Sequence, residues 1–275
     1  MLVKDFLPSA IVKEYISQYR LRHFVFSKEV LPTVKPFPPR PEQSLTFYVR
    51  GDETARYTKD RFEIKKPRSV ISGQFTQRVD RYVSYPEVLM TIVDFKPGAL
   101  YRLTGIPFTE FTDKDVDAEM VFSPEIKKVN ERLNSCEAYA EMLLIVETFF
   151  VHLVQRCKIE RLPVDSVLTL AAQDGDRSTD WLARHAYLSP RQLERKFDER
   201  IGISPKTFLR ICRFNASYWM HLKNPKLPWF DVAMSCGYTD YQHLVKEYKA
   251  FADATPNIFF AEEKKAPGRI LGLNK

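Results

Sequence analysis

Two segments in the last third of the chain carry long polar side chains at the spacing of one helical turn. Arg191 and Arg195 lie four positions apart in the first segment, as Gln242 and Lys246 do in the second. Residues at i and i+4 share one face of an α-helix. Arginine donates two hydrogen bonds to O6 and N7 of guanine, and glutamine pairs with the edge of adenine. These side chains therefore have the chemistry to contact base edges in DNA.

The two segments belong to one repeated unit. The sequence from Ser189 to Pro205 returns 51 positions later as Asp240 to Pro256, so that Leu193 corresponds to Leu244 and Phe197 to Tyr248. A repeat of this length indicates repeated architecture. Each copy has the layout of a helix-turn-helix unit, in which a supporting helix and a tight turn precede a second helix. The supports lie around Trp181 and Trp229.

The beginnings of these helices are marked by their caps. Ser189-Pro190, Ser204-Pro205 and Thr255-Pro256 each place a hydroxyl at the N-cap and proline at the first helical position. Asp240 is a fourth capping residue, after the turn at Gly237. Between the copies, the residues from Pro205 to Lys223 predict one long helix of about 28 Å. That length approaches the ~34 Å between successive major-groove faces of a duplex.

Helical geometry predicts which side chains of each second helix face outward. If Leu193, Phe197 and Ile201 are buried, Arg191, Arg195 and Asp198 point out, with Glu194 on the flank. If Leu244, Tyr248 and Phe251 are buried, Gln242, Lys246 and Lys249 point out, with Tyr241 and Val245 at the edges. For the first helix alone, a solvated face of mixed charge explains the pattern equally well.

Composition sets broader limits. The chain has 275 residues, of which 44% are apolar and 13% aromatic, which suffices for two packed domains. The net charge of +7 is compatible with a polyanionic partner. There is no apolar run typical of a signal peptide or a membrane span, so we expect a soluble, cytoplasmic protein without a membrane partner. The four cysteines are scattered, which favours reduced thiols over a disulfide framework or a zinc site.

The amino-terminal half predicts a different architecture. The segments 44–50, 69–76 and 88–95 are rich in β-branched and aromatic residues, which favours strands in a small β-rich domain. The segment 135–157 carries an apolar stripe from Tyr139 to Val154, which predicts a long helix. The stripe either packs on the β-rich domain or mediates dimerisation. We therefore expect an α+β protein with a β-rich domain and trailing helices at 1–158, an all-α domain at 163–261 and a flexible tail at 262–275.

The residues from about Pro163 to Phe260 resemble the DNA-binding domain of the AraC/XylS family of bacterial transcription regulators. The resemblance rests on Leu188-Ser189-Pro190-Arg191-x-Leu193-x-Arg195-x-Phe197, on Gly202-x-Ser204-Pro205, and on Val232-Ala233-x-x-x-Gly237-Tyr238-x-Asp240-Tyr241-x-x-Leu244. It implies seven helices with two helix-turn-helix units joined by the long helix. It further implies that the amino-terminal half resembles a cupin-like sensor domain, which binds a small molecule, dimerises the protein, or both.

With this resemblance, the expected DNA-contacting residues of the first unit are Arg191, Gln192, Glu194 and Arg195. Those of the second unit are Tyr241, Gln242, Val245, Lys246 and Lys249. Two residues depart from the family pattern. Tyr187 stands in the first turn where glycine is usual, so we expect a strained turn or one of different shape. Val245 contacts a thymine methyl at most and donates no hydrogen bond, which weakens base recognition by the second unit.

The sequence therefore predicts a sequence-specific regulator with double-stranded DNA and RNA polymerase as partners, and with a small-molecule effector or a homodimer as possible controls. Activation and repression both stay open. Two alternatives are an enzyme with a helical targeting module and a protein-interaction module. The sequence contains no Gly-x-Gly-x-x-Gly, Walker loop or clustered His-x-His, so we expect no catalytic residues, cofactor or metal site.

Overall fold

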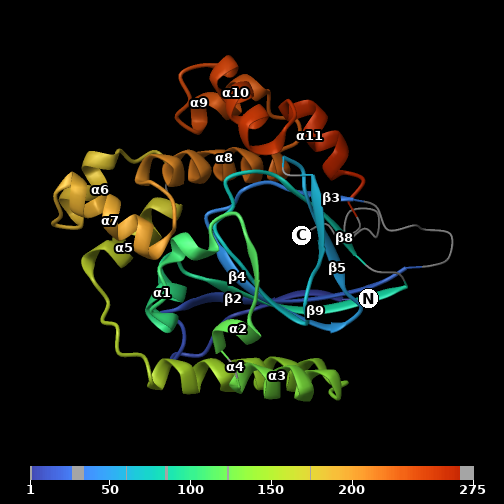
Figure 1. Ribbon diagram of the computed structural model, residues 1–275. Coiled ribbons are helices and arrows are strands. Elements are labelled where there is room, and N and C mark those ends of the chain that lie inside the picture. Colours follow the sequence, from blue (N-terminus) through green and yellow to red (C-terminus); the bar gives the residue numbers. More distant parts are fainter. Residues whose placement is uncertain are drawn as a thin grey trace.

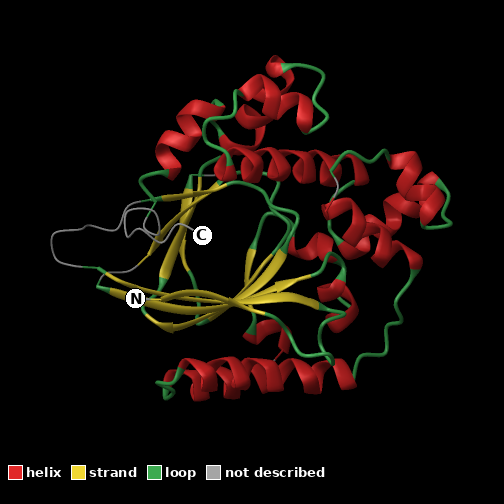
Figure 2. Ribbon diagram, turned by 180° about the vertical axis from the view of Figure 1, so that it is seen from behind, coloured by secondary structure: helices red, strands yellow, loops and turns green. Residues whose placement is uncertain are grey.

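The computed structural model describes residues 2–26, 34–59, 61–83, 86–122, 124–173 and 175–266. The amino-terminal half consists of two antiparallel sheets that face each other, with helices on the outer side of the larger sheet (Figure 1). The carboxy-terminal half is helical and lies along the opposite side of the sheets (Figure 2). The predicted α+β architecture of two parts is confirmed.

The described strands form one sheet of six and one of four. The six-stranded sheet has the order β1-β2-β9-β4-β7-β10, and the four-stranded sheet the order β3-β8-β5-β6. The bounds are β1 (Leu2–Phe6), β2 (Ile16–Val25), β3 (Lys35–Phe37), β4 (Gln43–Arg50), β5 (Glu53–Tyr57), β6 (Phe62–Lys65), β7 (Ser69–Ser72), β8 (Val79–Val83), β9 (Glu87–Phe95) and β10 (Asp115–Asp117). The three predicted extended segments correspond to β4, β7 and β9.

The longest strand, β2, was not predicted from the sequence. Tyr19 and Leu21 on one of its faces are buried in the main core, whereas Arg20 and Arg22 alternate with them and border a cavity between the two sheets. The two arginines form ion pairs with Asp94 and Asp5, respectively. The signal for a strand was present in the sequence, since Tyr19-Arg20-Leu21-Arg22 alternates apolar and polar residues, and it was missed.

Short helices follow the sheets and cover the larger one. They are α1 (Ala99–Thr104), the 3₁₀ helix η1 (Phe108–Phe111), α2 (Glu119–Phe122), α3 (Glu125–Asn134) and α4 (Tyr139–Gln155). Met142, Val146 and Phe150 of α4 are buried in the same core as Phe95 of β9, and the rings of Phe95 and Phe150 meet edge to face at 5.4 Å. The apolar stripe of α4 therefore packs on its own domain.

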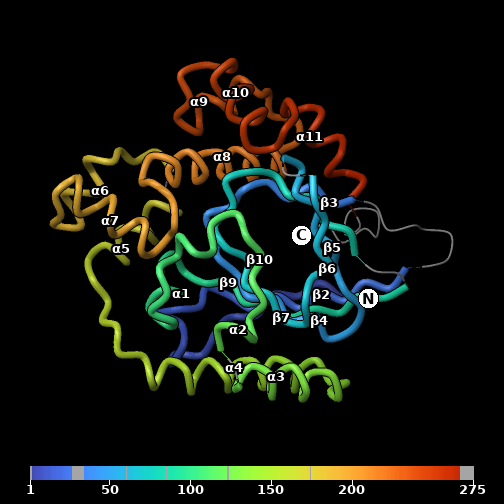
Figure 3. Tube along the Cα trace, in the orientation of Figure 1, coloured from blue at the N-terminus to red at the C-terminus, as the bar shows by residue number. Residues whose placement is uncertain are grey.

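The chain leaves α4 along an extended linker and enters the helical part (Figure 3). This part contains α5 (Pro163–Gln173), α6 (Thr179–His185), α7 (Pro190–Arg200), α8 (Pro205–Lys223), α9 (Trp229–Ser235), α10 (Tyr241–Ala252) and α11 (Pro256–Glu263). Within the described range these are the seven helices that the resemblance implies. The long helix α8 has the predicted bounds, and one apolar core joins both helix-turn-helix units.

The first turn corrects one expectation about Tyr187. Tyr187 adopts φ 55°, close to the φ of 72° at Gly237 in the second turn. In the first turn the amide of Leu188 donates to the carbonyl of Ala183, and in the second turn the amide of Tyr238 donates to the carbonyl of Ala233. Both bonds are 3.0 Å long and reach five positions back. The first turn therefore has the ordinary shape. The expected strain is present instead in Tyr187, whose side chain is 87% exposed.

The end of the helical part lies against the smaller sheet. Arg78 donates to the carbonyl of Ala252 at 3.1 Å and forms an ion pair with Glu262 at 2.7 Å. Glu263 is buried, and its carboxylate accepts a hydrogen bond from Tyr218 of α8 at 3.0 Å. Of the expected tail at 262–275, the first two residues thus belong to α11, and residues 267–275 lie outside the described part of the chain.

Candidate nucleic-acid interface

The second helix of the first unit, α7, begins with a complete capping box. The Ser189 hydroxyl accepts from the amide of Gln192 at 3.3 Å, and the Gln192 side-chain oxygen accepts from the amide of Ser189 at 2.9 Å. These bonds satisfy amides that a helix leaves unpaired at its start. Gln192 was expected to contact DNA. Its side-chain oxygen already accepts one bond within the cap, while its NH2 group is left to donate to a ligand.

The outer face of α7 is arranged as predicted. Leu193, Phe197 and Ile201 are buried, whereas Arg191, Glu194, Arg195 and Asp198 are exposed. Ser189, Arg191, Gln192 and Arg195 border an open hollow of about 410 Å³ on this face. The guanidinium of Arg191 has no ion-pair partner among the described residues, and Arg195 has only a distant one, Glu199 at 3.9 Å. Both guanidinium groups are therefore available to a polyanion.

The second helix of the other unit, α10, also begins with a capping residue. The Asp240 carboxylate accepts from the amide of His243 at 2.7 Å. Gln242, Lys246 and Lys249 are exposed, and Tyr241 and Val245 are half-buried. The charged side chains therefore stand at the centre of the outer face, with the expected edge residues beside them. Contact of these side chains with DNA stays a prediction.

An ion pair that was not predicted fixes α10 to α8. Glu247 is buried on the inner face of α10, and both of its oxygens accept from Arg210 of α8 at 3.0–3.2 Å. A bidentate pair of this kind fixes orientation as well as distance. The outer face of α10 is consequently held at a defined angle to the long helix. Helical periodicity places Glu247 on the face opposite Lys249, which indicates a carboxylate on the inner face of α10. Its partner Arg210 is 37 positions away in the sequence, so the pair itself was not predicted.

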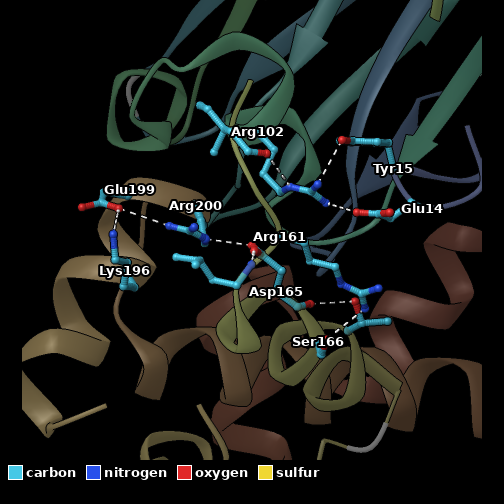
Figure 4. A network of polar contacts seen from close by, with 12 residues as sticks. Glu14, Tyr15, Arg102, Arg161, Asp165, Ser166, Lys196, Glu199 and Arg200 are labelled. Carbon is cyan, nitrogen blue, oxygen red and sulfur yellow. Dashed lines mark hydrogen bonds and ion pairs between the residues drawn. The ribbon is translucent and has the colours of Figure 1, made fainter. Parts of the chain in front are cut away.

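A second unpredicted group of contacts holds the end of α7 against the amino-terminal domain (Figure 4). Arg200 is only 1% exposed and forms ion pairs with Asp165 at 2.7 Å and Glu199 at 3.1 Å. Its backbone carbonyl accepts from Gln43 of β4 at 3.0 Å, and its guanidinium lies 4.9 Å from the Tyr101 ring of α1. The amino-terminal domain thus supplies a donor for a carbonyl that the helix end leaves unpaired.

The next residues continue this junction. Thr112 donates to the carbonyl of Gly202 at 2.8 Å. Gly202 has φ 83°, and a Cβ at this position would lie 2.4 Å from the Thr112 hydroxyl and 2.5 Å from the carbonyl of Phe108. Only glycine fits both the backbone angle and the space. The same network includes Arg102, which binds Glu14 at 2.6 Å and Tyr15 at 2.9 Å and donates to the linker carbonyl of Ile159 at 3.4 Å.

The thiols play no part in this surface. Cys136, Cys212 and Cys236 are buried, Cys157 is half-buried, and all four are free, as predicted. Burial raises the pKa of Cys236 to about 11 and the pKa of Cys212 well above its ordinary value. These groups therefore stay protonated thiols. No helix in the described part of the chain has both the length and the apolar composition to cross a bilayer.

Two capped helices with exposed basic faces, held by one long helix, define a DNA-binding protein of the helix-turn-helix class. In agreement, residues 182–262 match the family described as a helix-turn-helix domain. Residues 4–117 match a family described as a domain of unknown function (DUF6597). Residues 182–262 thus form a helix-turn-helix domain of the AraC type, and the chain is a DNA-binding transcription regulator.

One solved structure shares the fold over most of the chain, and two others match only part of it. ToxT from Vibrio cholerae has a TM-score of 0.50 and 10% identity, with 89% of this chain and 98% of that chain covered. The DNA-binding domain of AdpA in complex with a target DNA has a TM-score of 0.35 and 22% identity, over 38% and 95% of the chains. An AraC-type regulator from Chromobacterium violaceum has a TM-score of 0.34 and 24% identity, over 38% and 92%. Comparison with curated proteins gives no match.

Proposed function

We propose that this regulator recognises a bipartite DNA site, with α7 and α10 in successive major grooves. The observation that carries the proposal is the pair of capped helices whose exposed faces bear Arg191 and Arg195 in one unit and Gln242 and Lys246 in the other. The long helix and the Arg210–Glu247 pair support a fixed geometry between them. Such a function requires access to the chromosome, in the cytoplasm, and needs no catalytic group.

The two units differ in the chemistry that they offer. In the first, Arg191 and Arg195 suit guanine, and Glu194 accepts from the amino group of cytosine. In the second, Lys246 and Lys249 suit guanine or phosphate, while Val245 offers only an apolar contact. The first unit therefore dominates sequence choice, and the second contributes more to phosphate anchoring. Because the protein regulates transcription, we propose RNA polymerase as a partner.

A small anion is the effector that the amino-terminal domain suits best. A cavity of about 100 Å³ between the two sheets is bordered by Arg20, Arg22, Lys35 and Arg81, against the single carboxylate of Glu53. Arg81 is 9% exposed, lies 3.7 Å from Glu53, and its Nε and Nη2 atoms have no hydrogen-bond partner among the described residues. Unpaired buried donors are costly, and an anion would satisfy them. A homodimer would need a surface other than the buried stripe of α4.

The test replaces one side chain of each outer face and measures DNA binding by the full chain. Arg191→Ala should weaken binding to the preferred site by about 1–3 kcal/mol and relax the preference at one base pair. Lys246→Ala should weaken binding to all sequences alike and lower the slope of affinity against salt by about 1. Lys127→Ala on α3 is the matched control, since it removes one exposed positive charge outside the helical domain. Unchanged binding by both variants would refute the assignment of the two faces.

A further inference from the structure

A large hollow of the amino-terminal domain lies among its helices, outside the space between the sheets. Its volume is about 370 Å³, which is within the usual range of small-molecule sites, ~300–1,000 Å³. It is bordered by residues of α1, α2, α3 and α4. Figure 1 shows α3 and α4 beyond the larger sheet, on the side away from α8. The hollow is therefore separate from both the DNA-facing surface and the cavity between the sheets.

This hollow is an open groove, and the floor of the groove is apolar and rigid. Leu103, Phe122, Val129, Ile145 and Phe149 border it, and each is at most 9% exposed. All of them belong to the main core of the domain. The rings of Phe122 and Phe149 meet edge to face at 5.7 Å, which holds this part of the floor in place. A floor built from core residues offers a preformed surface to an apolar group.

The rim of the groove is basic. Lys128 and Arg132 stand one turn apart on α3, and the opposite side is bordered by His152 of α4 and by Arg156 directly after this helix. Glu125, the one carboxylate among the described residues of the rim, is already paired with Arg156 at 3.2 Å. Among the described residues, neither the Lys128 ammonium nor the Arg132 guanidinium has an ion-pair partner. The rim consequently has two uncompensated positive charges above an apolar floor.

From this combination we propose that the groove binds a small amphipathic anion, whose apolar body lies on the floor and whose carboxylate or sulfonate contacts Lys128 and Arg132. Shape supports a small molecule as the occupant, because residues of four helices line a concave site and the Glu125–Arg156 pair links α3 to the end of α4 at its edge. Charge supports an anion, because Lys128, Arg132 and Arg156 stand against one carboxylate, Glu125, among the described residues that line the site. A mainly apolar lining with a few polar or charged groups is the usual composition of small-molecule sites.

The experiment measures binding of 8-anilinonaphthalene-1-sulfonate to the full chain by fluorescence, with the neutral N-phenyl-1-naphthylamine as a comparison. The anionic dye should bind at least about tenfold more tightly than the neutral one, and Lys128→Glu combined with Arg132→Glu should remove most of that difference. The matched control is Lys127→Glu, on the same helix but outside the groove. It should change the affinity by less than twofold.

A second variant keeps the test decisive if the charge reversal disturbs folding. Thr148 borders the groove and is half-buried, so Thr148→Phe places a ring in the cavity and should weaken binding of both dyes. Circular dichroism confirms that each variant is folded. Equal binding of the two dyes, or full affinity in both groove variants, would overturn the proposal. It would also be overturned if the wild-type chain bound no dye and sedimented as a dimer that the charge reversal dissociates, since the groove would then be an interface between copies.

Discussion

Replacing Tyr187 by glycine should stabilise this protein, although tyrosine offers more side chain to pack. Tyr187 holds φ 55° in the first turn, a conformation that costs an L-residue about 1–2 kcal/mol. Its ring is 87% exposed, so its removal loses little packing. Glycine also lowers the free energy of unfolding by about 0.5–1 kcal/mol, because it gives the unfolded chain more conformational freedom. The net expectation for Tyr187→Gly is a gain of about 0–1.5 kcal/mol, with a midpoint of about 0.75 kcal/mol.

Urea unfolding followed by far-ultraviolet circular dichroism measures this change, and two further variants separate its causes. Tyr187→Ala removes the ring and keeps an L-residue at the same backbone angle, so its free energy of unfolding should stay near that of the wild type. Gly237→Ala is the reverse change in the second turn, at φ 72°, where a Cβ would lie 2.6 Å from the Asp176 carboxylate. It should destabilise by more than about 1 kcal/mol. If Tyr187→Gly proved no more stable than Tyr187→Ala, backbone strain at this turn would be refuted.

Two other expectations concern the junction and the cavity between the sheets. Gly202→Ala forces a Cβ to within 2.4 Å of Thr112 and should destabilise the full chain by about 2–4 kcal/mol. Thr112→Val removes only the hydroxyl that donates to the carbonyls of Gly202 and Phe108, and should cost about 1 kcal/mol. Comparable losses in urea unfolding would contradict the close packing. Burial lowers the pKa of Lys35 to about 8, with Arg40 adding to the effect. A bound anion favours the charged ammonium, so the affinity for sulfate, measured by calorimetry, should be constant below pH 8 and fall as the pH rises above it. Lys35→Met should abolish that fall, and a wild-type affinity that rose or stayed constant up to pH 9.5 would exclude Lys35 from the site.

Local signals were sufficient to predict the helical half. Ser189, Ser204 and Asp240 each accept from an amide three residues on, as their sequence context indicates. The buried and exposed faces of α7 and α10 follow from helical periodicity alone. The bounds of α8 were predicted for the same reason, because Pro205 starts it and the apolar pattern ends near Lys223. Each of these features depends on residues within a few turns of one another.

Features that depend on distant residues were not predicted. The ion pairs of β2 join Arg20 and Arg22 to Asp94 and Asp5, which other strands supply. The docking of α7 requires Gln43 and Thr112 from the sheet domain, which no pattern near Arg200 reveals. For the turn at Tyr187, the sequence correctly indicated backbone strain. It did not show that the turn keeps its ordinary shape, which the hydrogen bond from the amide of Leu188 to the carbonyl of Ala183 stabilises.

The central claim is that the outer faces of α7 and α10 read DNA, and selection from random duplexes tests it most directly. The wild-type chain should enrich a bipartite site whose two halves lie about one helical turn, 10–10.5 base pairs, apart. Under the same selection Arg191→Ala should lose the preference at one position of one half-site, while Lys246→Ala should enrich the same site at lower affinity. Enrichment of no common sequence by the wild type, or of an unchanged site by Arg191→Ala, would contradict the account.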